Sequence, residues 1–222
     1  MQKPSNFDST TISELLSDWI WSLKEHDVGA LVVLGPDPFG DASQRLVLAV
    51  HPESALPAAK TLARSSDFGP QWRLNHASLV SWGNLDRPSN ADGQDWRDSW
   101  LASGYRSQCR ISFELGAMRS FDCFMFSSKT LSNRSDAESM VWSALNIWPS
   151  LKIEIGQAIT PLSNREVDCL KLAFVGLTSK QASEHLGLSV RTIEFHLSNA
   201  AKKLGVNNRL GAIQRSLWMG VL

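Results

Sequence analysis

The sequence predicts an α+β domain, in which helices flank an antiparallel sheet, followed by a small all-α domain of four helices with a helix-turn-helix layout. Three observations predict this arrangement. Short runs rich in β-branched and aromatic residues come in two pairs, and helical patterns separate the pairs. After Pro161 only helical patterns remain. The 222 residues suit one medium domain and one small domain, so we expect domains at 1–153 and 162–222 and a linker at 154–161.

The chain opens with an amphipathic helix. Ser9, Thr10 or Thr11 can cap it, and apolar residues recur at helical spacing from Ile12 to Leu23. The later elements follow from the same reading of periodicity and turn residues. In chain order they are strands at 28–34 and 45–50 joined by a hairpin loop at 36–43, a helix at 53–65, an exposed loop at 83–94, a helix through Trp96 and Trp100, strands at 109–115 and 120–127, and a helix at 134–151.

The composition predicts a globular, cytoplasmic protein. Hydrophobic residues make up 43% of the chain and charged residues 20%. The first twenty residues carry Asp8, Glu14 and Asp18, unlike a signal peptide, and no stretch reaches the ~20 apolar residues of a membrane span. The three cysteines form an odd number without metal-ligand spacing, so we expect free thiols and no metal site.

Charge is distributed unevenly, although the net charge is zero. Residues 1–157 hold 14 Lys or Arg and 18 Asp or Glu, whereas residues 158–222 hold 8 and 4. A basic C-terminal third on an acidic body is typical of a nucleic-acid-binding module joined to a sensory or assembly module, although an ordinary solvated surface has the same balance. Eight of the nine tryptophans precede residue 150, and they fit either a filled core or a ligand cavity.

The C-terminal part shows the spacing of a helix-turn-helix. Helices are expected at 164–175 and 179–185, and Gly187 makes the sharp turn that follows. Ser189 is the expected cap of a third helix, and a fourth begins at about residue 208. Two helices joined by a short turn containing glycine are the arrangement that places the second of them in a DNA groove.

The third helix has one apolar and one polar side at 100° per residue. The expected buried stripe is Ile193, Leu197, Ala200 and Leu204. The opposite side holds Arg191, Phe195, Ser198 and Lys202, flanked by Glu194 and Asn199, with His196 and Lys203 beside the stripe. Such side chains suit a major groove, where Arg191 would take guanine, Glu194 a cytosine amino group, and Asn199 adenine or the backbone.

A longer series of residues stands at fixed spacing through this part of the chain: Leu162-Ser163, Arg165-Glu166, Leu170, Leu172, Gly176, Thr178-Ser179-Lys180, Leu186-Gly187-Leu188-Ser189, Arg191 through His196, Asn199, Lys203 through Val206, Asn208-Arg209 and Ala212. The series resembles the LuxR-type helix-turn-helix family. Two departures are Gln181-Ala182-Ser183, where the family usually has Glu-Ile-Ala, and Cys169 in place of a core aliphatic residue.

The resemblance implies a regulator of bacterial transcription that binds double-stranded DNA as a homodimer on an inverted repeat. The third helix would enter the major groove, the fourth would support the dimer, and basic side chains would hold phosphates. The expected DNA-binding residues are Thr178, Ser179, Lys180, Ser189, Arg191, Thr192, Glu194, Phe195, His196, Ser198, Asn199, Lys202, Lys203 and Arg209.

Within that family, the third helix is most similar to the quorum-sensing branch, whose N-terminal α+β domain binds an acylated homoserine lactone. Asp67 lies 15 residues before Trp82, about where the family's lactone-amide aspartate and pocket tryptophan would fall. The residues expected at a ligand site on this basis are Asp67, Trp72, Trp82, Trp96, Trp100 and Tyr105. A small acyl ligand is then expected, and no other cofactor.

Three hypotheses for the whole chain remain open. The first is a regulator controlled by a small acyl ligand such as an acyl-homoserine lactone. The second is a ligand-independent regulator or antagonist whose N-terminal domain serves only dimerisation or the binding of a related regulator. The third is an enzyme or thiol sensor, which we disfavour because no nucleophile and base stand at a recognisable spacing, although Cys109 and Cys123 lie on neighbouring strands.

Overall fold

The computed structural model describes residues 9–36, 45–65, 67, 79–86, 94–116, 119–159 and 162–222. Its contacts divide the chain into two compact units, Met1–Lys152 and Ile153–Leu222. Within the part that the structure describes, no helix is long and apolar enough to cross a membrane.

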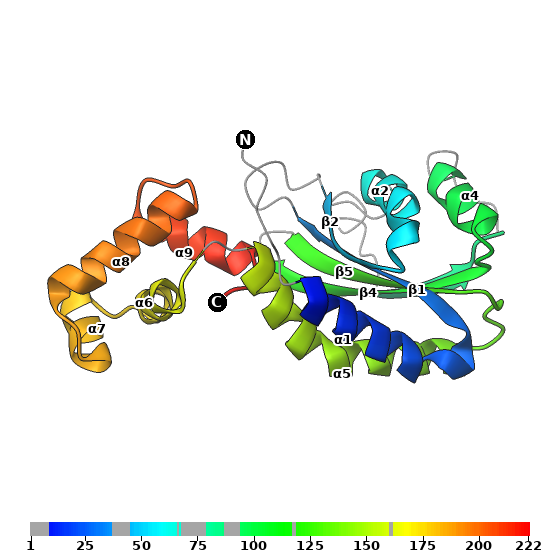
Figure 1. Ribbon diagram of the computed structural model, residues 1–222, viewed down its shortest axis with the longest axis horizontal. Coiled ribbons are helices and arrows are strands. Elements are labelled where there is room, and N and C mark those ends of the chain that lie inside the picture. Colours follow the sequence, from blue (N-terminus) through cyan, green and yellow to red (C-terminus); the bar gives the residue numbers. More distant parts are fainter. Residues whose placement is uncertain are drawn as a thin grey trace. The chain divides into compact units, whose positions relative to one another are not determined.

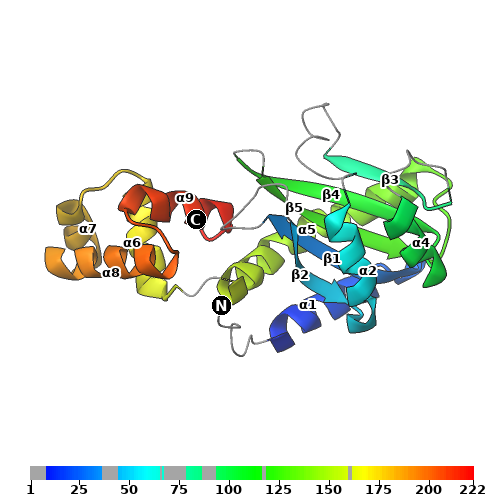
Figure 2. The same ribbon diagram turned by 90° about the horizontal axis from the view of Figure 1, so that it is seen from above.

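The N-terminal unit is built on an antiparallel sheet with the strand order β2-β1-β5-β4-β3 (Figure 2). The strands are β1 (Val28–Pro36), β2 (Arg45–His51), β3 (Val80–Asn84), β4 (Ser107–Gly116) and β5 (Arg119–Ser127). β5 lies at the centre and is buried along its whole length. The α+β class and the four strands expected from the sequence are confirmed, with ends that differ by a few residues.

Helices cover both faces of this sheet (Figure 1). On one face lie α1 (Ser9–Ser22) and the first part of α5 (Arg134–Ile159); on the other lie α2 (Leu56–Arg64) and α4 (Gln94–Ala102). Two short 3₁₀ helices, η1 (Lys24–His26) and η2 (Glu53–Ala55), lead into β1 and α2. The indole of Trp19 donates a hydrogen bond to Ser143 and so ties α1 to α5.

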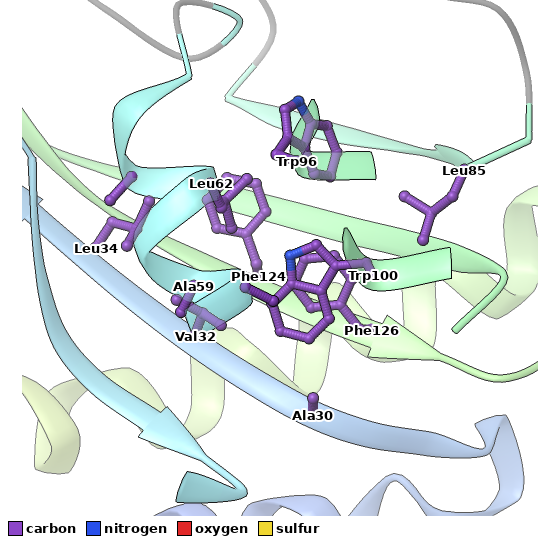
Figure 3. Packing of buried hydrophobic residues seen from close by; sticks show 12 residues of the cluster. Ala30, Val32, Leu34, Ala59, Leu62, Leu85, Trp96, Trp100, Phe124 and Phe126 are labelled. Carbon is purple, nitrogen blue, oxygen red and sulfur yellow. The ribbon is translucent and has the colours of Figure 1, made fainter. Parts of the chain in front are cut away.

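Side chains alternate between the two faces of the sheet, because successive side chains of a strand point to opposite sides, except at the register shifts in the β1–β2, β1–β5 and β4–β5 pairs. The ring of Phe121 packs at a tilt against Trp148 of α5, with a centroid separation of 5.2 Å, and Phe121 therefore faces the α1/α5 side. Phe124 and Phe126 face the α2/α4 side, where they join Trp96 and Trp100 in one buried cluster (Figure 3). We call this side the covered face, because α2 and α4 lie over it.

The structure differs from the sequence-based expectation at two places. β3 was not predicted, because its five residues include Gly83 and Asn84, which are typical of turns. Helix α5 continues to Ile159, so residues 154–159 of the expected linker are helical. Gly156 does not end the helix. It is buried, and a Cβ added there would lie 3.8 Å from the carbonyl oxygen of Gly220, so this part of α5 is closely packed within the C-terminal unit.

The C-terminal unit holds four helices after the end of α5: α6 (Asn164–Phe174), α7 (Ser179–Leu186), α8 (Val190–Lys203) and α9 (Arg209–Trp218). Their shared core includes Cys169, Leu170 and Ala182, so one residue from each departure from the LuxR-type pattern, Cys169 and Ala182, is a buried packing residue. The small all-α domain with a helix-turn-helix layout is confirmed.

Candidate functional site

Each turn of the helix-turn-helix is fixed by side-chain caps. Thr178 accepts a hydrogen bond from the backbone N–H of Gln181, whose side chain accepts one from the N–H of Thr178 at 2.9 Å. Gly187 ends α7 with a φ of 65°, a left-handed conformation that favours glycine. Ser189 then caps α8 by accepting from the N–H of Thr192 at 3.1 Å. These caps satisfy free N–H donors at both helix starts and so define where α7 and α8 begin.

Helix α8 buries the stripe that its sequence predicts. Ile193, Leu197, Ala200 and Leu204 are at most 4% exposed, as expected. On the opposite side, the exposed residues are Arg191, Glu194, Phe195, Ser198 and Lys202. Phe195 is 60% exposed, so this face also presents an aromatic ring to solvent.

Two polar contacts hold α8 against its neighbours. Ser179 at the start of α7 donates to the carboxylate of Glu194. At the other end of α8, the Lys203 ammonium lies 2.8 Å from the carboxylate of Glu166, which is only 4% exposed. Burial alone would raise the pKa of Glu166, but hydrogen bonds from Lys203 and from Ser163 outweigh it and lower that pKa.

The predicted DNA-binding residues thus fall into two groups. One group has a bond inside the domain: Thr178 and Ser189 as caps, Ser179 with Glu194, Thr192 with Ser189, Lys203 with Glu166, and Arg209, which donates to the carbonyl oxygen of Leu177. The other group comprises Lys180, Arg191, Phe195, Ser198 and Lys202, which are exposed, and His196 and Asn199, which are half-buried. Lys203 and Arg209 therefore have a structural partner that their sequence positions did not reveal.

Asp67, the residue expected to contact a lactone amide, lies against helix α4. Its carboxylate accepts a hydrogen bond of 2.9 Å from the indole N–H of Trp96, and the guanidinium of Arg97 lies 3.5 Å away. The Asp67 side chain is 19% exposed. In this structure Asp67 anchors the start of α4 to the segment that follows α2.

Of the other expected ligand residues, Trp96 contacts Asp67, whereas Trp82 lies on the other face of the sheet. Trp82 pairs directly with Cys109, whose sulfur faces the carbonyl oxygen of Ala137 in α5, so Trp82 points to the face opposite Trp96 and Trp100. Trp82 is also 40% exposed at the sheet edge. The strand register decides this placement, because a shift of one residue in a strand moves a side chain to the other face. Trp72 lies outside the described residues.

Trp96, Trp100 and Tyr105 do come together on the covered face. The Trp100 ring stacks on Phe126 with a centroid separation of 3.6 Å, and Tyr105 meets Trp100 edge-on at 5.4 Å (Figure 3). Burial raises the pKa of the Tyr105 hydroxyl. These aromatic rings pack together between α4 and the sheet.

Apart from Trp100, sequence reasoning did not identify a second set of residues in this region. Five buried polar atoms of this region have no hydrogen-bond partner: Ser81 Oγ, Arg97 Nη1, Trp100 Nε1, Gln108 Oε1 and Ser112 Oγ. Serine and glutamine in strands carry no distinctive sequence signal, so only the strand pairing shows that these side chains lie on the covered face.

The cysteines are three free, buried thiols. Burial raises the pKa of Cys109 to about 12 and raises the pKa of Cys123 as well. In the sheet Cys109 pairs with Met125 and Cys123 with Ile111, so the two cysteines are not opposite one another. This geometry gives no support to the thiol-sensor hypothesis.

Comparison with known proteins places these features in context. Residues 160–216 match the model of the family described as bacterial regulatory proteins, luxR family. The chain is 33% identical over 89 residues to the transcriptional activator protein AnoR of Acinetobacter nosocomialis, covering 38% of this chain and 37% of AnoR. It is 34% identical over 83 residues to the transcriptional activator protein LuxR of Aliivibrio fischeri, covering 37% and 33%. The matches therefore span about a third of the length of these two relatives, both of which are named as transcriptional activators.

Among solved structures, SdiA of Escherichia coli resembles the chain with a TM-score of 0.51 and 19% identity, covering 95% of this chain and 91% of SdiA. A structure of SdiA in complex with octanoyl-rac-glycerol gives a TM-score of 0.51 at 18% identity, covering 99% and 97%. At these identities the similarity concerns the fold alone.

Proposed function

Because the C-terminal domain of this chain is a LuxR-family domain, we propose that the protein regulates transcription by binding DNA as a dimer on an inverted repeat. Helix α8 enters the major groove with Arg191 and its neighbours toward the bases. Lys180 and Lys202 contact phosphates, and the two half-sites lie about one helical turn apart.

The exposed side of α8 is the observation that carries this proposal. It presents two cations, one carboxylate, one hydroxyl and one aromatic ring, while the apolar stripe on its other side is buried. An arginine at the start of a helix that follows a tight turn is well placed for a bidentate contact to guanine. The caps at Thr178 and Ser189 support the proposal, since they make this presentation rigid.

The test begins with selection of a preferred sequence from random double-stranded DNA by the full-length protein. Arg191→Ala should weaken binding to the selected site by about 1–3 kcal/mol, which is roughly 5-fold to 150-fold, and relax preference at one position of each half-site. Arg165→Ala is the matched control, since Arg165 is an exposed arginine on α6 with only a 3.8 Å contact to Asp168. Equal affinity of the wild type and Arg191→Ala would refute the assigned role, and selection of no sequence would refute specific binding.

A second function, control by a small acyl molecule, is supported by the fold similarity to SdiA and by the unpartnered polar atoms on the covered face. The alternative, a regulator whose N-terminal unit only dimerises or binds a related regulator, is supported by the dense packing of Trp100 on Phe126. The two hypotheses make different predictions: only under the first does a small molecule change the affinity of the protein for the selected DNA.

A further inference from the structure

Phe195 lies at the centre of the exposed side of helix α8. At 100° per residue, it stands about 170° from the mean direction of the buried stripe of that helix. Arg191 lies one turn before Phe195 and Ser198 one turn after it, and both are exposed. Any molecule that contacts this side of α8 between Arg191 and Ser198 therefore meets the ring of Phe195.

The side chains next to Phe195 in the chain have contacts inside the protein. The carboxylate of Glu194 accepts a hydrogen bond from Ser179 at the start of α7. The imidazole of His196 is half-buried and packs against the Phe195 ring at an interplanar angle of 63°, with a centroid separation of 5.9 Å. The Phe195 ring is thus supported by a neighbour on its own helix, while most of its surface is open to solvent.

The proposed docking of α8 in the major groove brings Phe195 against the edges of the bases. Those edges carry hydrogen-bond donors and acceptors, and the largest apolar group among them is the C5-methyl group of thymine. A phenyl ring has no donor or acceptor of its own. Pressed against a polar base edge, it would displace water and leave a base donor or acceptor unpaired, which costs free energy. Against a thymine methyl group, the same ring buries apolar surface on both partners.

We infer that Phe195 is a specificity-determining residue that recognises the C5-methyl group of a thymine in each half-site. The inference deepens the proposed DNA binding and rests on it. Residues four apart on a helix are separated by about 6 Å along its axis, and successive base pairs by about 3.4 Å. The thymine therefore lies one or two base pairs from the pair that Arg191 reads. Arg191 supplies hydrogen bonds and Phe195 supplies the apolar contact.

The test removes the methyl group and nothing else. Deoxyuridine differs from thymidine by this one group and pairs with adenine in the same way, so the hydrogen-bonding groups of the base pair are preserved. In the sequence selected by the full-length protein, each thymine is replaced in turn by deoxyuridine, at the same position of both half-sites. Affinity is measured by fluorescence anisotropy at one fixed salt concentration, because phosphate contacts make affinity depend on salt.

The wild type should lose affinity at one thymine position, by about fourfold for each half-site, as expected for one buried methyl group. Phe195→Ala should bind the selected site more weakly, and the same replacement by deoxyuridine should change its affinity by less than about 1.5-fold, since the contact is already gone. Phe195→Leu keeps an apolar side chain and should retain part of the preference for the methyl group.

Phe174→Ala is the matched control, because Phe174 is a phenylalanine of α6 that is 52% exposed and lies outside α8. It should keep the affinity of the wild type and the full effect of the methyl group. Neither Phe195→Ala nor Phe174→Ala should lower the melting temperature appreciably, since both rings are exposed. A change in the methyl effect is therefore a change in recognition and not in folding.

Equal loss of affinity on methyl removal in the wild type and in Phe195→Ala overturns the inference, as does a half-site in which no thymine responds. A responding thymine more than two base pairs from the pair that Arg191 reads overturns it as well. Arg191→Ala separates these failures from failure of the proposed function. Weakened binding by Arg191→Ala with an unchanged methyl effect in Phe195→Ala refutes the inference alone, whereas selection of no DNA sequence refutes both.

Discussion

The contact between Glu166 and Lys203 makes the C-terminal unit sensitive to one substitution. Glu166→Ala removes the carboxylate that accepts from the backbone N–H of Ser163 at 2.7 Å and that pairs with Lys203 at 2.8 Å. The capping bond contributes about 1 kcal/mol. Lys203 is 40% exposed, so solvent screens the pair and limits its contribution to at most about 1 kcal/mol. The total of about 2 kcal/mol lowers the melting temperature of so small a unit by about 8–16 °C.

Scanning calorimetry of the full-length protein measures this change. Glu166→Gln retains an acceptor for Ser163 but removes the charge, so it should cost about half as much as Glu166→Ala. Glu184→Ala, at an exposed carboxylate on α7, is the control and should change stability by less than about 0.5 kcal/mol. Equal effects of Glu166→Ala and Glu166→Gln would refute the capping contribution, and no effect of either would refute the reasoning as a whole.

The pair of Glu166 and Lys203 also makes the free energy of unfolding depend on pH, in a direction that follows from the pKa of Glu166. The folded protein lowers the pKa of Glu166, so its contribution is present above the ordinary glutamate pKa of about 4.3 and is lost as the pH falls through the lowered value. The stability difference between the wild type and Glu166→Gln should therefore be constant near neutral pH and shrink below about pH 4. A difference that grows as the pH falls would contradict the assignment.

Two further predictions concern the backbone and the thiols. Gly187→Ala should destabilise the C-terminal unit by about 1 kcal/mol in urea unfolding, since φ is 65° and an added Cβ would meet nothing within 4 Å, leaving backbone strain as the sole cost; an unchanged midpoint would contradict this. Cys109, Cys123 and Cys169 should resist a thiol-specific chromogenic reagent at pH 8 in the native protein and all react after unfolding, because burial raises the pKa of each thiol; a fast-reacting native thiol would contradict it.

The C-terminal unit could be predicted closely from the sequence because its information is local. A helix repeats every 3.6 residues, so the positions of Ile193 and Leu197 alone define which side of α8 is buried. The cap at Ser189 and the turn at Gly187 each act within four residues. What the sequence did not reveal there are contacts between helices, such as Lys203 with Glu166, 37 residues apart.

The N-terminal unit could be predicted only as a class, because its site depends on strand register. The hydrophobic runs identify β1 and β5, yet nothing in the sequence states that β5 inserts between β1 and β4. The short strand β3 was missed, and with it the pairing that decides which face each of its side chains occupies. An aromatic residue in such a strand cannot be assigned to a pocket from spacing alone.

Ser81 and Trp82 show the consequence most clearly. They are adjacent in the chain, and the tryptophan is the residue that a search for ligand contacts selects, because it is large and can donate a hydrogen bond. The register Ser81 to Arg110 and Trp82 to Cys109 sends the tryptophan toward α5 and the serine to the covered face. There the buried hydroxyl of Ser81 lacks a partner, while Trp82 remains 40% exposed. Since a buried unpaired hydroxyl requires a partner and an exposed indole requires none, Ser81 is the stronger indication of a ligand.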